Sequence, residues 1–217
     1  MDYANKRWWS VVLIVATIAA TQTWETSAGH PGFIRDEEGS RRIITQFYNY
    51  VDVITGLKLD NMLKLTQVFV QQLLDSIPGH DRGNTAQMLE DYISNVENIR
   101  EDGGSIEEKE LMLMELQQLI ATIKSGLAQE EKEDIILRRG LLGMFELLAR
   151  LSIEERKFND KFAKAATLLR LRMAEESVER HRELIDLLQA IDSEQDIVVR
   201  ERLFEKFKQI RHYHTSQ

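Results

Sequence analysis

The chain has 217 residues, a formal net charge of −8 and no cysteine. The absence of cysteine excludes disulfide scaffolds, cysteine-based zinc sites and cysteine nucleophiles. Leu, Ile, Glu, Lys, Arg, Gln and Ala dominate, and runs of alternating β-branched residues are missing. This composition is typical of an all-α protein. We therefore predict an antiparallel bundle of about six to eight amphipathic helices, with a long helix or a broken helix pair in its C-terminal half.

The first 28 residues differ from the rest of the chain. Lys6 and Arg7 precede an uncharged apolar run, WWSVVLIVATIAA at 8–20, and small polar residues follow it. This order is typical of a secretory signal peptide. Thr26 and Ala28 fit the −3 and −1 positions of one cleavage site, and an earlier site within 20–28 stays open.

The rival interpretation of this segment is an uncleaved signal anchor. Its apolar run is shorter than the ~20 residues that a spanning helix needs. We therefore expect a signal peptide over 1–28, a flexible arm over 29–39 and a single all-helical domain over 40–217. The mature protein is then secreted and extracellular, with no stable membrane span.

Apolar spacing and stop signals place the helices of the first half. We expect a first helix from Ser40 that Gly56 interrupts, a second from Asp60 to the stop at Pro78-Gly79, and a third from an Asn84–Gln87 capping box to Gly103-Gly104.

In the second half we expect a fourth helix over 105–127 and a fifth from about Glu130 to Leu151. A sixth begins at Ser152 and reaches Ile191, either continuous or broken near Ser177. A last helix opens at an Asp192–Gln195 capping box.

The tetrad SIEE occurs at Ser105–Glu108 and again at Ser152–Glu155. A serine followed three residues later by a glutamate forms a capping box, in which each side chain bonds the other residue's backbone N–H. The residues that follow the two copies match poorly, which argues against an internal repeat. We predict that both copies begin helices.

The fifth predicted helix is apolar on more than one face, through Leu141, Leu142, Met144, Phe145, Leu147, Leu148 and Leu151. This favours a central, most buried helix. The alternative is a helix of a bundle that opens onto lipid. Gly140 and Gly143 within it indicate close helix packing, with a kink beside a binding groove as the alternative.

The sequence contains no recognisable catalytic or metal-binding pattern. The five histidines (His30, His80, His181, His212 and His214) form neither Glu-x-x-His pairs nor a His-Glu-x-x-His helix. A Gly-rich phosphate loop and a Gly-x-Ser-x-Gly elbow are also missing. We predict a protein that is not an enzyme and has no cofactor or metal; its ligand-binding residues stay unknown.

Charge is distributed unevenly along the chain. Residues 101–134 hold ten acids against three bases, whereas 135–217 hold sixteen bases against fourteen acids. The acidic segment indicates a solvated helix face, with a cationic partner as the alternative. The overall balance argues against a nucleic-acid partner.

In overall character the chain resembles the secreted salivary proteins of blood-feeding flies, with a short signal, an acidic cysteine-free body and long helices such as 105–127 and 152–191. The resemblance implies a binding protein that modulates host haemostasis, inflammation or immunity through an extracellular protein or a small amphiphilic ligand. It assigns no residue. The alternative is a lipid carrier of apolipoprotein type, and homo-oligomerisation is left open.

Overall fold

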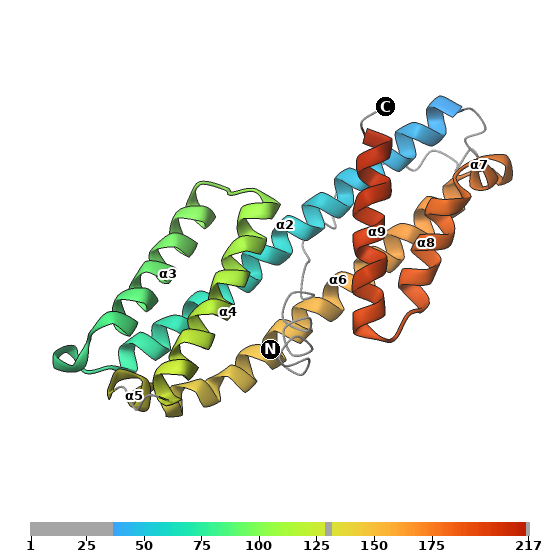
Figure 1. The fold of residues 1–217 in the computed structure, drawn as a ribbon. Helices are drawn as coiled ribbons and strands as arrows, with labels where there is room; N and C mark the ends of the chain where they lie inside the picture. The colour runs from blue at the N-terminus through green and yellow to red at the C-terminus, as the bar shows by residue number, and fades with distance from the viewer. Residues whose placement is uncertain (1–36, 129–131, 216–217) are drawn as a thin grey trace.

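Two long antiparallel helices, α2 (Glu37–Ser76) and α6 (Met144–Arg172), run through the whole length of the molecule (Figure 1). The structure is a computed structural model that describes residues 37–128 and 132–215. At one end lie α3 (Asn84–Glu101), α4 (Ile106–Ala128) and α5 (Lys132–Gly140); at the other lie α7 (Glu175–Arg180), α8 (Arg182–Ser193) and α9 (Ile197–Thr215). The described ranges contain no β-strand, so the all-α prediction is confirmed.

Helix α2 is continuous, and the predicted interruption at Gly56 is wrong. Ile54 and Leu59, on either side of the glycine, are 0% and 1% exposed. Burial of such side chains outweighs the roughly 1 kcal/mol by which glycine disfavours a helix interior. Asp60 does not cap a second helix either. Its carboxylate instead forms an ion pair with Lys109 of α4, in which Lys109 Nζ lies 2.9 Å from Asp60 Oδ1.

The predicted stops at Pro78-Gly79 and Gly103-Gly104 are confirmed. A short 3₁₀ turn, η1 (Gly79–Asp81), separates α2 from α3. After α3, Gly103 has a φ of 69°, a left-handed conformation that favours glycine. The backbone N–H of Gly104 then donates to Ile99 O at 2.8 Å, which closes the end of the helix.

The predicted fifth helix is divided differently. A 3₁₀ turn, η2 (Leu141–Gly143), separates α5 from α6, and α6 then passes Leu151 and Ser152 without a break. The expectation that this segment is the most buried is wrong, since Leu142 and Phe145 are 66% and 64% exposed. The central position belongs to α2, which packs against α3, α4, α5 and α6.

Of the two alternatives left open for the sixth predicted helix, the structure has the break near Ser177. Helix α6 ends at Arg172, Met173 and Ala174 are extended, and α7 begins at Glu175. Ser177 lies within α7 and is fully buried, and its Oγ accepts a hydrogen bond from Ser40 Oγ at 2.8 Å. This bond ties α7 to the first turns of α2.

Two predicted capping boxes are wrong. Helix α9 begins at Ile197, and Asp196 rather than Asp192 caps it, because Asp196 Oδ1 accepts from the N–H groups of Val198 and Val199 at 2.8 and 3.2 Å. At the start of α3, the Gln87 side chain donates to Asp91 instead of turning back toward Asn84.

The two copies of SIEE have different structures. Ser105 N donates to Glu108 Oε2 at 2.7 Å and Glu108 N donates to Ser105 Oγ at 3.1 Å, so the first copy is the predicted capping box. The second copy lies inside α6, where Ser152 Oγ donates to Ala149 O at 2.9 Å. The prediction for the second copy is wrong because buried Leu151 keeps the helix continuous.

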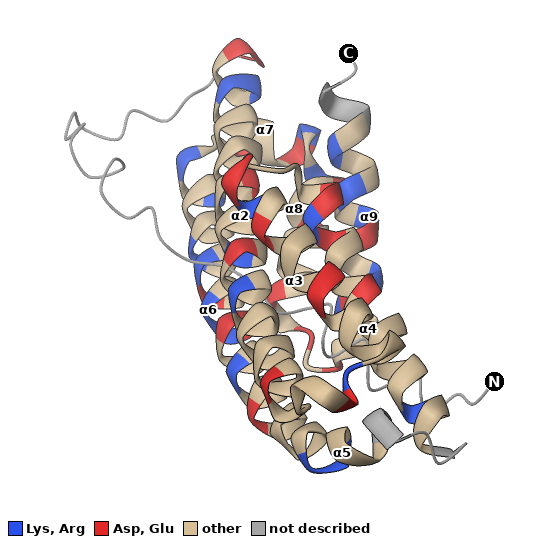
Figure 2. Ribbon diagram, turned by 90° about the vertical axis from the view of Figure 1, so that its left-hand side faces the viewer, with Lys and Arg blue, Asp and Glu red and all other residues tan. Residues whose placement is uncertain are grey.

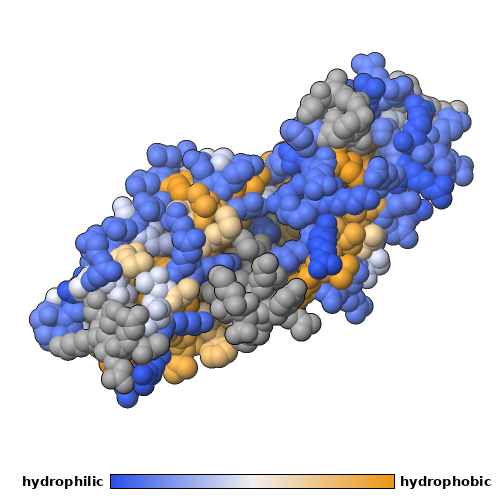
Figure 3. Space-filling model, viewed as in Figure 1, coloured by the Kyte–Doolittle hydropathy of each residue, from blue (hydrophilic) through white to orange (hydrophobic). Residues whose placement is uncertain are grey.

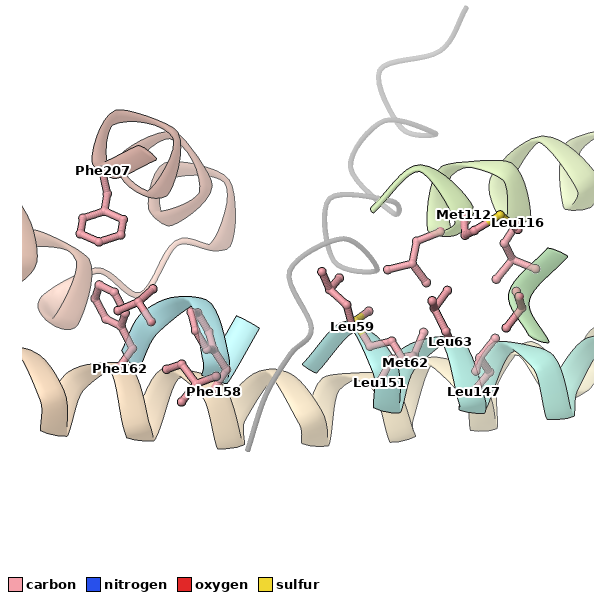
Figure 4. Close-up of a cluster of buried hydrophobic side chains, with 14 of the residues drawn as sticks. Leu59, Met62, Leu63, Met112, Leu116, Leu147, Leu151, Phe158, Phe162 and Phe207 are labelled. Carbon is pink, nitrogen blue, oxygen red and sulfur yellow. The ribbon is translucent and has the colours of Figure 1, made fainter. Parts of the chain in front are cut away.

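The apolar core follows α2 and α6 from end to end, but its composition changes along the way (Figure 4). We call one half the aliphatic end; it contains Leu59, Met62 and Leu63 of α2, Met112 and Leu116 of α4, and Leu147 and Leu151 of α6. We call the other half the aromatic end; it contains Phe47 and Tyr48 of α2, Phe158 and Phe162 of α6, and Phe207 of α9. We call the stretch between the two ends the waist; it contains Lys58 of α2 and Glu155 of α6.

Candidate functional site

A groove of about 430 Å³ lies between α2 and α6 at the aliphatic end. Its lining comes from Asn61, Lys64, Leu65, Val68, Phe69 and Gln72 of α2, Gly143 of η2, and Glu146, Leu147, Arg150, Glu154 and Lys157 of α6. The two helices present these side chains at intervals of three and four residues, which is the spacing of one helix face. The groove is therefore a product of the two longest helices.

The floor of the groove is apolar. Phe69 and Leu147 belong to the core and are 4% and 6% exposed. Leu65 is partly buried against the same core, and Val68 at the edge is 48% exposed. A ligand with an apolar body would therefore meet a floor that is already ordered by core packing.

The rim of the groove is charged, and most of its charges are paired. Arg150 binds Glu146 at 2.6 Å. Glu154 accepts from Lys157 at 2.6 Å and from Asn61 at 3.3 Å. Lys64 is exposed and forms no ion pair with any described residue. It is therefore the rim cation with no acidic partner to displace.

The two glycines of the predicted fifth helix have different roles. A Cβ atom at Gly140 would lie 2.6 Å from Leu73 Cδ2, so this glycine allows α5 to approach α2, as the close-packing interpretation predicts. A Cβ atom at Gly143 would meet Phe69 at 3.6 Å, an ordinary contact. Gly143 instead lies in the 3₁₀ turn that lines the groove, and the alternative interpretation of a kink beside a binding groove stays a prediction.

A second polar cluster is buried at the waist, outside the groove. Lys58 of α2 is only 8% exposed and its Nζ lies 4.8 Å from the centre of the Phe158 ring. Glu155 of α6 accepts a hydrogen bond from Asn159 at 3.2 Å, while its Oε2 is buried without a partner among the described residues. Figure 3 shows a hollow near the middle of the molecule with apolar surface on either side.

Burial shifts both groups toward their neutral forms. It lowers the pKa of Lys58 from 10.5 to about 8, and the carboxylates of Glu155 and Glu110 oppose this shift only in part. Burial likewise raises the pKa of Glu155 from 4.5 to about 7, against the attraction of Lys58, Asn159 and Arg200. Desolvation therefore dominates over pairing at the waist.

Ion pairs surround this buried cluster and connect helices across the waist. Lys208 of α9 binds Glu110 of α4 at 3.4 Å. Arg211 of α9 binds Asp52 of α2 through both carboxylate oxygens. Lys208 lowers the pKa of Lys58. Glu201 raises the pKa of Glu155. Helix α9 therefore contributes charges of both signs to the waist. The waist is thus a junction of α2, α4, α6 and α9.

The histidines considered in the sequence lie apart from one another where the structure describes them. His80 lies in η1, His181 between α7 and α8, and His212 in α9, and no group of three His, Asp or Glu side chains in the described ranges could hold a metal ion. His30 lies outside the described residues. The structure brings none of these histidines into the groove.

Sequence reasoning missed both the groove and the waist. Lys58 was detectable, because it falls on the same helix face as Val51, Ile54 and Met62, all of them buried. Glu155 was obscured by the capping interpretation of the second SIEE, which placed it on a solvated first turn. The groove depends on which faces of α2 and α6 pack together, and the sequence pattern does not specify that pairing.

Compared with known proteins, the chain matches no protein-family model, no curated protein and no solved structure.

Proposed function

We propose that this is a non-enzymatic helical binding protein that holds a small anionic amphiphile in the groove between α2 and α6. One observation carries the proposal: the groove combines an apolar floor, Leu65, Phe69 and Leu147, with the ammonium of Lys64, which forms no ion pair with a described residue, at its rim. The apolar part of a ligand is removed from water on the floor, and its anionic group accepts a charge-assisted hydrogen bond from Lys64.

The composition of the lining supports binding rather than catalysis. Its polar members are Asn, Gln, Lys, Arg and Glu, and it contains no serine, histidine or tyrosine. The two glutamates are engaged by Arg150, Lys157 and Asn61. Such pairing suits the positioning of a charged ligand, whereas a general base has to be available to a substrate.

The test uses anilinonaphthalene sulfonate, a fluorescent anionic amphiphile. We expect saturable binding, weakened about tenfold by Lys64→Glu because a charge-assisted hydrogen bond is replaced by repulsion. Lys124→Glu makes the same charge change on an exposed position of α4 and is the matched control. Equal loss in the two variants would show that only net charge matters and would overturn the proposal.

We propose further that the mature protein is secreted and acts on a host, as the resemblance to salivary proteins of blood-feeding flies implies. The apolar run at 8–20 and the small residues after it support secretion. A pull-down from plasma with the mature protein tests the host-directed part, with the Lys64→Glu variant reporting whether the groove takes part.

Lipid carriage is the second candidate function. The observation that favours it is the exposure of Leu142 and Phe145, in the segment for which an opening bundle was the alternative. A carrier that opens clears the turbidity of phospholipid vesicles, whereas a binding protein with a fixed groove leaves them intact. Clearance by the wild-type protein would favour the carrier.

A further inference from the structure

The outward face of α6, together with Leu142 just before it, carries an unusual share of exposed apolar surface. Five of the twelve large exposed apolar side chains in the described ranges lie there: Leu142, Phe145, Ile153, Leu168 and Leu171. Leu142 and Leu171, at the two ends, are each 66% exposed. Since α6 is about 43 Å long at 1.5 Å per residue, the apolar positions are spread over its full length.

These side chains lie opposite the buried face of α6. Leu142, Ile153 and Leu171 are separated by 11 and 18 residues, which are close to whole numbers of helical turns. Leu151, Phe158 and Leu169 point to the other side and are at most 5% exposed. Helix α6 therefore has two apolar stripes: one is buried in the core, and the other faces solvent.

Positive charge accompanies this second stripe. Arg156, Lys164 and Arg170 are exposed on the outward half of the helix and form no ion pair with described residues. Asp160 is the acid among them, while Glu146 nearby is bound by Arg150. Figure 2 shows bands of Lys and Arg recurring along α6. The face is thus cationic although the whole chain carries −8.

We propose that the outward face of α6 docks on an anionic membrane surface. Exposed apolar side chains flanked by cations are the combination by which interfacial helices lie in the plane of a bilayer. The leucines and Ile153 enter the boundary between headgroups and acyl chains, and Arg156, Lys164 and Arg170 meet anionic headgroups. No described helix is long and apolar enough to cross a membrane, and docking of this kind requires no crossing.

Charge complementarity distinguishes this partner from a second copy of the chain. Two copies meeting through this face would place two cationic surfaces against each other. Like charges at close range are unfavourable in an interface. Docking does not depend on the proposed groove ligand, although Arg150 and Lys157 at the groove rim lie on the same side of α6.

The test is co-sedimentation of the full chain with vesicles of phosphatidylcholine, with and without phosphatidylserine. We expect binding only when phosphatidylserine is present, with loss at high salt because headgroup charges are screened. Leu142→Ser combined with Leu171→Ser should weaken binding about tenfold, because each substitution removes the favourable free energy of moving a leucine side chain from water into the bilayer. Leu111→Ser with Met114→Ser, 51% and 41% exposed on α4, is the matched control.

Three outcomes would overturn the docking proposal. The first is equal binding to both vesicle types, and the second is an equal loss in the α4 control variant. The third is a dimer in sedimentation equilibrium that the Leu142→Ser, Leu171→Ser variant abolishes, which would make the face a contact between copies. Vesicle sedimentation without clearance of turbidity separates docking from lipid carriage, and binding of anilinonaphthalene sulfonate by the double variant reports separately on the groove.

Discussion

Lys58 of α2 and Glu155 of α6 attract each other in the interior of the waist, yet no ion pair joins them in the described part of the chain. Lys58 faces the Phe158 ring, and Glu155 receives one hydrogen bond from Asn159. Neither charge recovers the hydration that it loses on folding. The waist therefore responds to pH in a way that surface ion pairs do not.

The free energy of unfolding should have a minimum between about pH 7 and 8. Because the pKa of Glu155 is raised from 4.5 to about 7, the folded protein binds more protons than the unfolded chain between pH 4.5 and 7. The free energy of unfolding therefore falls as pH rises through that range. Because the pKa of Lys58 is lowered from 10.5 to about 8, the unfolded chain holds the extra proton above pH 8, and stability rises again. Urea unfolding across pH measures the curve.

Glu155→Gln removes one limb of that curve. We expect the fall in stability between pH 4.5 and 7 to shrink by roughly 3 kcal/mol, the scale of a pKa shift of this size. Glu146→Gln, on the exposed side of the same helix, is the matched control and should keep the wild-type profile. Parallel profiles for the wild type and Glu155→Gln would contradict the assignment of this limb to Glu155.

The two SIEE serines should respond differently to the same substitution. Ser105→Ala removes an N-cap and should destabilise the fold by about 0.5–2 kcal/mol. Ser152→Ala removes only a bond from Ser152 Oγ to a carbonyl of the preceding turn, and alanine is the better helix former. Thermal unfolding of both variants measures the difference. Equal losses would show that the second copy also caps a helix.

Gly56→Ala should stabilise the protein by about 0.5–1 kcal/mol, the usual gain when alanine replaces glycine inside a helix. A Cβ atom at this position meets nothing within 4 Å, so no steric penalty opposes the gain. Gly140→Ala is the informative comparison, because its Cβ atom would lie 2.6 Å from Leu73. A lower unfolding temperature for Gly56→Ala would mean that α2 bends or opens at this point.

Secretion predicts a processed N-terminus. If residues 1–28 include a cleaved signal peptide, the exported product begins between Thr21 and Gly29. Since Trp8, Trp9 and Trp24 are the only tryptophans, a product that begins at Gly29 should show tyrosine-like fluorescence. N-terminal sequencing of exported protein measures the start, and recovery of Met1 would contradict the prediction.

The apolar spacing predicted the helical class and most buried faces, because one face of each helix must leave water whatever its neighbours are. The glycine pair Gly103-Gly104 likewise predicted the end of α3, because the left-handed backbone conformation at Gly103 favours glycine. These features depend on a few consecutive residues, so the sequence contains the information directly.

Features that depend on long-range packing were not predicted. Gly56 and Ser152 both resemble helix boundaries locally, yet Leu59 and Leu151 beside them are buried in the aliphatic end and keep α2 and α6 continuous. The exposure of Leu142 and Phe145 depends on which side of α6 faces α2. The groove and the waist are consequences of the same pairing, so neither could be derived before it.

The bond between Ser40 and Ser177 joins residues 137 positions apart. Phe47 of α2 likewise packs on Phe207 of α9. The ribosome therefore releases the first half of α2 long before any of its partners in α7, α8 and α9 exist. The second half of α2 meets α3 and α4 soon after its own synthesis. Assembly during translation thus begins with the second half of α2, α3 and α4, and the first half of α2 joins α7 and α9 last.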